Sequence, residues 1–213
     1  MLVTRSIAAL AILSYLSSCS NSGGGNQKTI CDTVCLKDSI KFRDDQNKFK
    51  PYVFISAKNC NADTLRWGYV GGPKTSLSFK KYKLNKDFTS CFINDTSYAW
   101  LLFNVCETGR GYIYKLPYSK AVSFSMSSAA INGFDPKFSV AKGMVAYTDK
   151  GNILVEEMAT QKKATMTFGK PIEIDLDFIH DVIDSVNITP THIWAKVKID
   201  NEWKELQKDI TLK

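Results

Sequence analysis

The segment Met144–Phe168, MVAYTDKGNILVEEMATQKKATMTF, decides the fold class. Two runs of apolar, β-branched and aromatic residues, Met144–Tyr147 and Ile153–Met158, flank the polar stretch Asp149–Asn152. Runs of this composition are typical of strands. Gly151 and its asparagine neighbour tolerate the positive φ of a hairpin turn. A third run closes the segment, which therefore predicts a three-stranded antiparallel unit.

The same unit recurs before and after this segment. Further copies start at Trp100 and Ile193, and a degenerate one covers Arg66–Leu84. The offsets of roughly 42 to 48 residues are typical of propeller blades. The middle copy resembles a blade of the secreted β-propeller type, in which a strand ending in Tyr147-Thr148-Asp149 leads through Gly151-Asn152 to the next strand. The resemblance implies a small, four-bladed propeller, and a β-sandwich built from hairpins is the alternative.

Helical periodicity is nearly absent outside the first residues, so we predict an all-β domain. The expected strands cover residues 52–56, 65–70, 77–82, 98–105, 112–116, 121–126, 144–147, 153–158, 164–168, 172–177, 193–199 and 203–206. An apolar content of 44% with 12% aromatic residues argues against disorder.

Residues 1–18 have the three-part layout of a secretory signal peptide. A single charge at Arg5 precedes the apolar stretch Ile7–Leu16, and the small residues Ser17 and Ser18 follow. The stretch is too short to cross a bilayer, which takes roughly 20 apolar residues. We expect this segment to be removed on export.

The residues Leu16-Ser17-Ser18-Cys19 resemble the lipobox of bacterial lipoproteins. The resemblance implies that Cys19 receives a diacylglycerol and further acyl chains such as palmitate, and that it becomes the first residue of the mature chain. Acyl chains would then hold the protein on a membrane.

Residues 19–30 form the expected tether, because the polar glycine and serine run after Cys19 has nothing to bury. Residues 31–213 remain as a single β-rich domain. Ser20 follows the cysteine instead of an aspartate, which favours sorting to the outer membrane. The absence of acidic residues there favours its periplasmic side, with the cell surface as the alternative.

The formal net charge of +7 and the pI near 9.0 leave few partner classes open. Nucleic acid is scarce where an exported protein resides, so we expect no nucleic-acid partner. Anionic lipid headgroups and acidic glycans are consistent with a basic surface, and a simple contribution to solubility is the plainer interpretation.

Five cysteines remain when Cys19 carries a lipid, and the exported compartment permits disulfides. An odd number leaves one cysteine free or paired with another chain. We expect a bridge between Cys91 and Cys106, because each closes a predicted strand on either side of one turn. Cys60 would then pair with Cys31 or Cys35. The spacing of Cys31 and Cys35 resembles that of copper-handling thioredoxin-like proteins, whose function would need reduced thiols.

The segment Glu173–Asp184 holds the best candidates for chemistry. As a strand it would place Glu173, Asp175 and Asp177 on one face, where their oxygens could bind Ca²⁺, although a solvated face explains the same alternation. His180 lies beside acids, but no nucleophile motif accompanies it. We therefore expect no enzyme and no cofactor.

The expected function is that of a noncatalytic binding or scaffold module in the cell envelope. Its membrane contact is the lipid on Cys19, and its partner there is a protein or a glycan. The alternative is a metal-dependent or hydrolytic envelope enzyme that uses the segment Glu173–Asp184.

Overall fold

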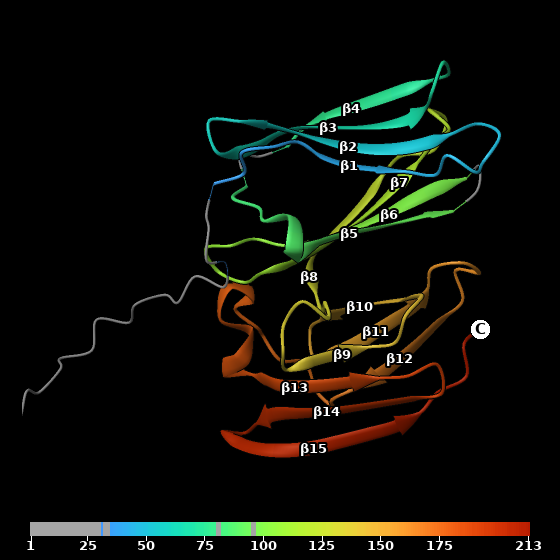
Figure 1. The fold of residues 1–213 in the computed structure, drawn as a ribbon. Coiled ribbons are helices and arrows are strands. Elements are labelled where there is room, and N and C mark those ends of the chain that lie inside the picture. Colours follow the sequence, from blue (N-terminus) through green and yellow to red (C-terminus); the bar gives the residue numbers. More distant parts are fainter. Residues whose placement is uncertain (1–30, 32–34, 80–81, 95–96) are drawn as a thin grey trace, which may run out of the picture.

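The computed structural model describes residues 31, 35–79, 82–94 and 97–213, and its strands form three sheets (Figure 1). The first sheet contains β1 (Ile40–Arg43), β2 (Pro51–Lys58), β3 (Asn61–Tyr69) and β4 (Lys74–Ser78) in that order. The central sheet has the order β12 (Lys163–Thr167), β11 (Asn152–Glu157), β10 (Met144–Asp149), β8 (Ser125–Ala130), β7 (Gly111–Pro117), β6 (Tyr98–Asn104) and β5 (Thr89–Asn94). The third has the order β15 (Glu202–Asp209), β14 (His192–Ile199), β13 (Ile183–Ile188) and β9 (Phe138–Val140).

All neighbouring strands are antiparallel except β9 and β13. Two short 3-10 helices, η1 (Lys86–Phe88) and η2 (Leu176–Asp181), are the helical elements among the described residues. The prediction of an all-β fold is therefore confirmed.

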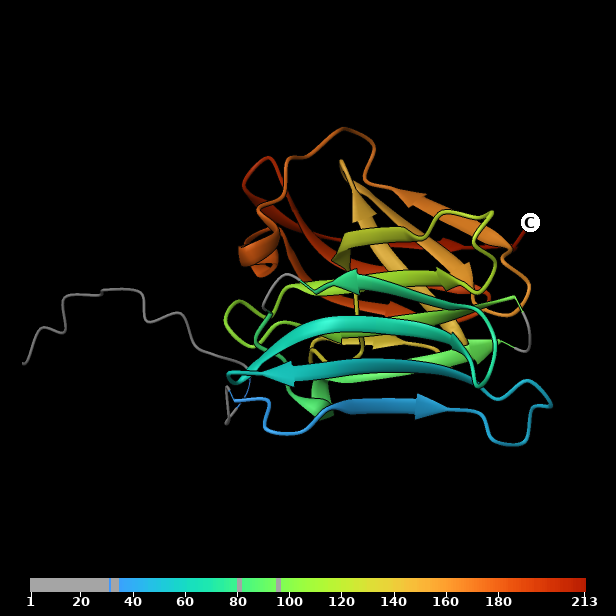
Figure 2. The same cartoon turned by 90° about the horizontal axis from the view of Figure 1, so that it is seen from above.

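Two separate hydrophobic cores hold the layers together, with the central sheet between the other two (Figures 1 and 2). In the first core, Ile55 and Leu65 of the first sheet pack with Leu101 and Phe103 of β6. The second core joins β10 to β12 with the third sheet. In β14 of the third sheet, buried and partly exposed side chains alternate strictly. The buried ones face this core and are Ile193, Ala195, Val197 and Ile199.

The central sheet curls into a half-barrel because its two halves are joined through β8. This strand pairs with β7 along most of its length but with β10 only at Ala130, opposite Tyr147. The β7–β8 pairing shifts register between Gly111 and Ile113, and a β-bulge of this kind bends a strand. A Cβ on Gly111 would lie 2.4 Å from the Ala130 carbonyl oxygen, so only glycine permits this close approach.

The hairpin predicted from the deciding segment is present. Asp149 pairs with Asn152, and Lys150 and Gly151 form the two-residue turn with φ of 45° and 81°. Positive φ at both positions is the signature of a type I′ turn.

The described strands do not separate into four blades. The copies that start at Trp100 and Met144 lie in one continuous sheet, while the degenerate copy and the third copy belong to the two outer sheets. Equal hairpin spacing cannot distinguish hairpins that open into layers from hairpins that turn about an axis. The sequence also missed β1, β5, β9 and β13, whose runs are short or interrupted by polar residues.

The expected strand over residues 172–177 is wrong. These residues are irregular until η2 begins, and Asp175 caps this helix by accepting a hydrogen bond from the Asp177 backbone N–H. The alternation of exposure is still present, because Ile172 and Ile174 pack against the second core while Glu173 and Asp175 are exposed. Side chains on an irregular segment can therefore alternate between packed and exposed positions in the same way as those of a half-buried strand.

The predicted Cys91–Cys106 bridge is also wrong. Cys106 bonds Cys31, Cys35 bonds Cys60, and Cys91 is free. Cys91 lies opposite Leu101 in the β5–β6 register, and Cys106 comes five residues later, about 16 Å further along the strand direction. A disulfide needs Cα atoms within about 7 Å, so the two cannot meet.

The two bridges fasten the start of the domain to the turns after β2 and β6. Both cysteines of the Cys31–Cys35 pair are oxidised, each to a different partner, so the reduced thiols needed for copper handling are not present. The expected signal peptide, the expected lipidation site Cys19 and the expected tether lie outside the described residues. No helix in the described part of the chain is long and apolar enough to cross a membrane.

Candidate binding site in the central sheet

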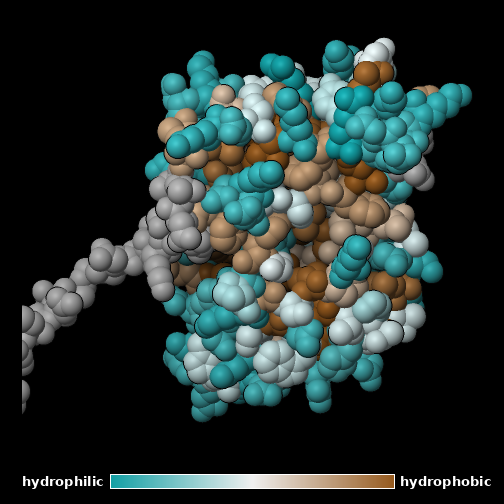
Figure 3. Space-filling view, viewed as in Figure 1, coloured by the Kyte–Doolittle hydropathy of each residue, from teal (hydrophilic) through white to brown (hydrophobic). Residues whose placement is uncertain are grey.

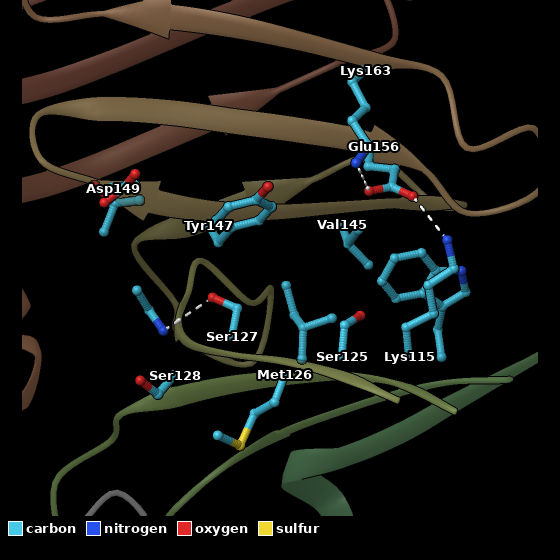
Figure 4. A pocket seen from close by; sticks show the side chains of 14 residues that line it. Lys115, Ser125, Met126, Ser127, Ser128, Val145, Tyr147, Asp149, Glu156 and Lys163 are labelled. Carbon is cyan, nitrogen blue, oxygen red and sulfur yellow. Dashed lines mark hydrogen bonds and ion pairs between the residues drawn. The ribbon is translucent and has the colours of Figure 1, made fainter. Parts of the chain in front are cut away.

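The concave side of the half-barrel encloses a groove of about 540 Å³ (Figure 4). Strands β6, β7 and β8 form one wall, and β10 to β12 form the other. The lining residues are Trp100, Ile113, Lys115, Ser125, Met126, Ser127, Ser128, Ala129, Val145, Tyr147, Thr148, Asp149, Glu156 and Lys163. The groove thus lies between the two cores and belongs to neither.

A small apolar cluster forms the base of the groove. It includes Trp100, Ile113 and Val145, which lie on the strand faces opposite those that fill the two cores. The Met158 carbonyl oxygen accepts hydrogen bonds from the Tyr98 hydroxyl at 2.7 Å and from the Trp100 indole N–H at 3.2 Å. Because these bonds link β6 to the end of β11, they hold the two walls at a fixed separation.

One buried carboxylate in the lining of this groove lies between two lysines. The Glu156 side chain is 6% exposed, and its oxygens lie 3.4 Å from the Lys115 Nζ and 3.2 Å from the Lys163 Nζ (Figure 4). Lys115 also lies over the rings of Tyr98 and Trp100, at 4.7 Å and 4.9 Å from their centroids. The carboxylate is thus compensated, as a buried charge must be, and the rings add cation–π attraction.

The edge of β8 is open along the groove. Ser125, Met126 and Ser127 pair with β7 on one side, and no described strand pairs with them on the other. In an antiparallel sheet each strand directs backbone N–H and C=O groups to both neighbours. The open edge of β8 therefore presents backbone donors and acceptors to the groove.

The Arg110 side chain binds β8 next to its bulge, at Ser128. Its guanidinium donates to the Ser128 carbonyl at 2.8 Å and to the Ser128 hydroxyl at 2.9 Å. The same guanidinium lies 3.7 Å from Asp177. The open stretch of β8 therefore ends at Ser127.

The predicted acidic site is dispersed in the structure, and none of its residues lines the groove. Glu173 and Asp175 are exposed, and Asp177 lies beside Arg110. Asp184 lies 2.7 Å from the Lys137 ammonium. No group of three potential metal ligands occurs within the described ranges, so the Ca²⁺ ligands expected at these positions are not assembled.

His180 pairs with an acid that the sequence did not single out. Its Nε2 lies 2.7 Å from an Asp135 oxygen, and its Nδ1 lies 3.1 Å from the Ile183 carbonyl oxygen. The hydrogen bond with Asp135 raises the His180 pKa, and burial opposes this in part. Burial raises the Asp135 pKa, but the hydrogen bonds from His180 and the Lys137 N–H bring it below its usual value. This pair ties the start of β9 to η2.

We expect the pair to make stability depend on pH. A histidine whose folded pKa exceeds its unfolded value of 6.5 stabilises the fold below that pH, and this contribution is lost as the pH rises through the folded pKa. Thermal unfolding of the wild type and His180→Gln at pH 5.5 and pH 8 measures it. The difference between the two proteins should shrink by up to about 1 kcal/mol at pH 8, since solvent at the His180 side chain, which is 36% exposed, screens the pair. An unchanged difference would contradict this assignment.

Of the four tryptophans considered for a carbohydrate face, only Trp194 and Trp203 share a surface, which is the outer face of the third sheet. Trp67 and Trp100 are buried, and their indole N–H groups bond backbone carbonyls. Trp203 is 45% exposed on β15, the edge strand of the third sheet, and does not line the groove. It is the most exposed of the four, as expected from its charged neighbours.

The environment of the Cys91 thiol does not favour reactivity. It is the free cysteine among the described ones, and burial raises the pKa of its thiol. A thiol that stays protonated is a poor nucleophile and a poor metal ligand.

No protein-family model, curated protein or solved structure matches the chain. The function is therefore argued from the groove itself.

Proposed function

We propose that the chain is a lipid-anchored, noncatalytic binding module of the cell envelope. The lipobox-like residues Leu16–Cys19 support the anchor, and two disulfides in the domain fit an oxidising compartment. Anchoring on the periplasmic side of the outer membrane is part of the proposal. For the fold we favour the sandwich alternative, as two sandwich-like halves that share the central sheet.

The ligand we propose is an extended segment of a partner protein. The open edge of β8 along the groove carries this proposal, because unpaired strand groups are complementary to another strand. Ser125 and Ser127 add small side chains that leave room for a neighbouring backbone. The lysines around Glu156 and the exposed part of Tyr147 would contact the side chains of such a segment.

A glycan is the less favoured ligand of this groove. Sugar rings stack on exposed aromatic faces. Trp100 is only 5% exposed, and its neighbour Tyr98 is buried beneath Lys115. The base of the groove therefore offers apolar packing and little free ring surface.

Site-specific photo-cross-linking in cells tests the proposal. A photoreactive residue at Ser125 should capture an envelope protein, and the same residue at Ser76 on the exposed edge of β4 is the matched control. The added Ser127→Lys substitution should reduce capture at Ser125 at least tenfold, because the long side chain fills the space beside the open edge.

Two outcomes would contradict the proposal. Equal capture at Ser125 and Ser76 would mean that the groove is not the binding site. Capture at Ser125 that Ser127→Lys leaves unchanged would mean that the partner does not use the open edge. Folding of each variant is checked by its melting temperature.

A further inference from the structure

Exposed apolar side chains gather at one end of the first core. They are Phe49 in the β1–β2 loop, Val70 in the β3–β4 turn, and Val122 and Phe124 in the β7–β8 loop, with exposed fractions of 50%, 52%, 58% and 38%. We call these four residues the apolar tip. The three loops lie at the right-hand end of the upper half in Figure 1 and on the right-hand side in Figure 2. Figure 3 shows this end from the same side as Figure 1, with hydrophilic residues around a few hydrophobic ones.

Side-chain and backbone contacts connect these loops. The Phe49 ring lies 5.7 Å from the Tyr69 ring, which lies 4.8 Å from the Tyr118 ring at the start of the β7–β8 loop. The Val70 N–H donates to the Lys50 carbonyl. The tip is therefore one packed end of the domain, and its apolar residues are not scattered singly over the surface.

Lysines surround the apolar tip. Lys48, Lys50, Lys74 and Lys120 are exposed, and no ion pair involving them occurs among the described residues. Lys74 and Lys120 line one hollow with Val122 and Phe124. The acids of the β1–β2 loop are Asp44, which bonds the N–H groups of Gln46 and Asn47, and Asp45, which pairs with Arg43. The tip is thus apolar with a positive rim.

The attachment point of the tether lies at the other end of the same sheets. Cys35 is bonded to Cys60 in the turn after β2, whereas Phe49 precedes β2. The eight residues of β2 span about 26 Å. The stretch from Cys19 to Cys31 reaches at most about 40 Å when fully extended. It is therefore long enough for the domain to turn its tip toward the membrane that holds the anchor.

We propose that the apolar tip inserts into the anionic surface of the bilayer to which the chain is anchored. Apolar side chains on loop ends enter the headgroup boundary, and flanking lysines keep their charges at the anionic surface. A protein partner is less favoured because interfaces between proteins are depleted in lysine. Only the choice of bilayer rests on the proposed lipid anchor, and the binding chemistry of the tip does not.

Amide hydrogen exchange of the full-length protein purified from membranes tests this inference. The protein is measured in detergent, with phosphatidylcholine vesicles, and with vesicles containing about one third phosphatidylglycerol. Exchange of residues 44–50, 70–73 and 118–124 should slow only with the anionic vesicles. The variant F49S/V122S should lose this protection, whereas Trp203→Ser should keep it, because Trp203 is an exposed apolar residue outside the tip. All substituted positions are exposed, and melting temperatures check that the variants fold.

The charge contribution is measured on the same vesicles with K48Q/K120Q. At about a fivefold effect for each lysine, binding of the tip should weaken roughly 25-fold. The inference is overturned if the three loops exchange equally in detergent and with anionic vesicles, or if F49S/V122S keeps full protection. It is also overturned if protection requires added membrane protein. Intact mass reports the lipid on Cys19 separately, so failure of the anchor and failure of the tip are distinguishable.

Discussion

Replacing Cys31 and Cys106 together with alanine is expected to lower the free energy of unfolding by about 4.5 kcal/mol. The bridge closes a span of 75 residues. In the chain-entropy description, closing a longer loop removes more freedom from the unfolded chain. Chemical denaturation of the wild type and the variant under non-reducing conditions measures the difference.

The matched control is the removal of Cys35 and Cys60, which close a span of 25 residues. The same description gives a loss of about 3.5 kcal/mol for this bridge. A smaller loss for the Cys31–Cys106 variant than for the Cys35–Cys60 variant would contradict the assigned connectivity. Cys91→Ala should form no new bridge and leave both native ones intact.

Trp100→Ala is expected to lower the free energy of unfolding by about 3–5 kcal/mol, as for other buried large aromatic side chains. The substitution empties the base of the groove and removes the hydrogen bond to the Met158 carbonyl. It also removes one of the two rings beneath Lys115. Denaturation measures the stability, and photo-cross-linking at Ser125 measures whether the groove still binds its partner.

The matched control is Trp203→Ala, which makes the same substitution at an exposed tryptophan. This tryptophan is 45% exposed on the outermost strand of the third sheet, so its loss should change stability by less than about 0.5 kcal/mol. Similar losses for the two variants would mean that Trp100 does not hold the walls of the groove together.

Local structure was largely predictable from the sequence. Periodicity and turn residues identified the hairpin of β10 and β11 and the strand β14, because the local preferences there agree with the burial that the fold imposes. The same reasoning failed over residues 172–177. After Pro171, apolar and acidic residues alternate as they do in a half-buried strand. None of the described strands pairs with this segment, however.

The arrangement of the hairpins could not be predicted from one sequence. Whether hairpins join in one sheet depends on contacts such as Ala130 with Tyr147, which local patterns do not encode. The disulfide connectivity has the same origin, because Cys31 and Cys106 are 75 residues apart in the sequence and are brought together by the tertiary fold.

The candidate site was missed for a related reason. The sequence drew attention to exposed acids near His180, while the buried acid of the groove is Glu156, in a run that reads as an ordinary strand end. A charged residue at an apolar position of β11 was the available signal. Its partners Lys115 and Lys163 come from other strands, so their meeting required the fold.

Amide hydrogen exchange of β8 with and without the protein captured at Ser125 tests the central claim most directly. If an extended segment adds to the open edge, exchange within Ser125–Ser127 should slow in the complex, while the exposed edge strands β4 and β15 remain unchanged. Unchanged exchange in β8 with the partner bound would contradict strand addition in the groove.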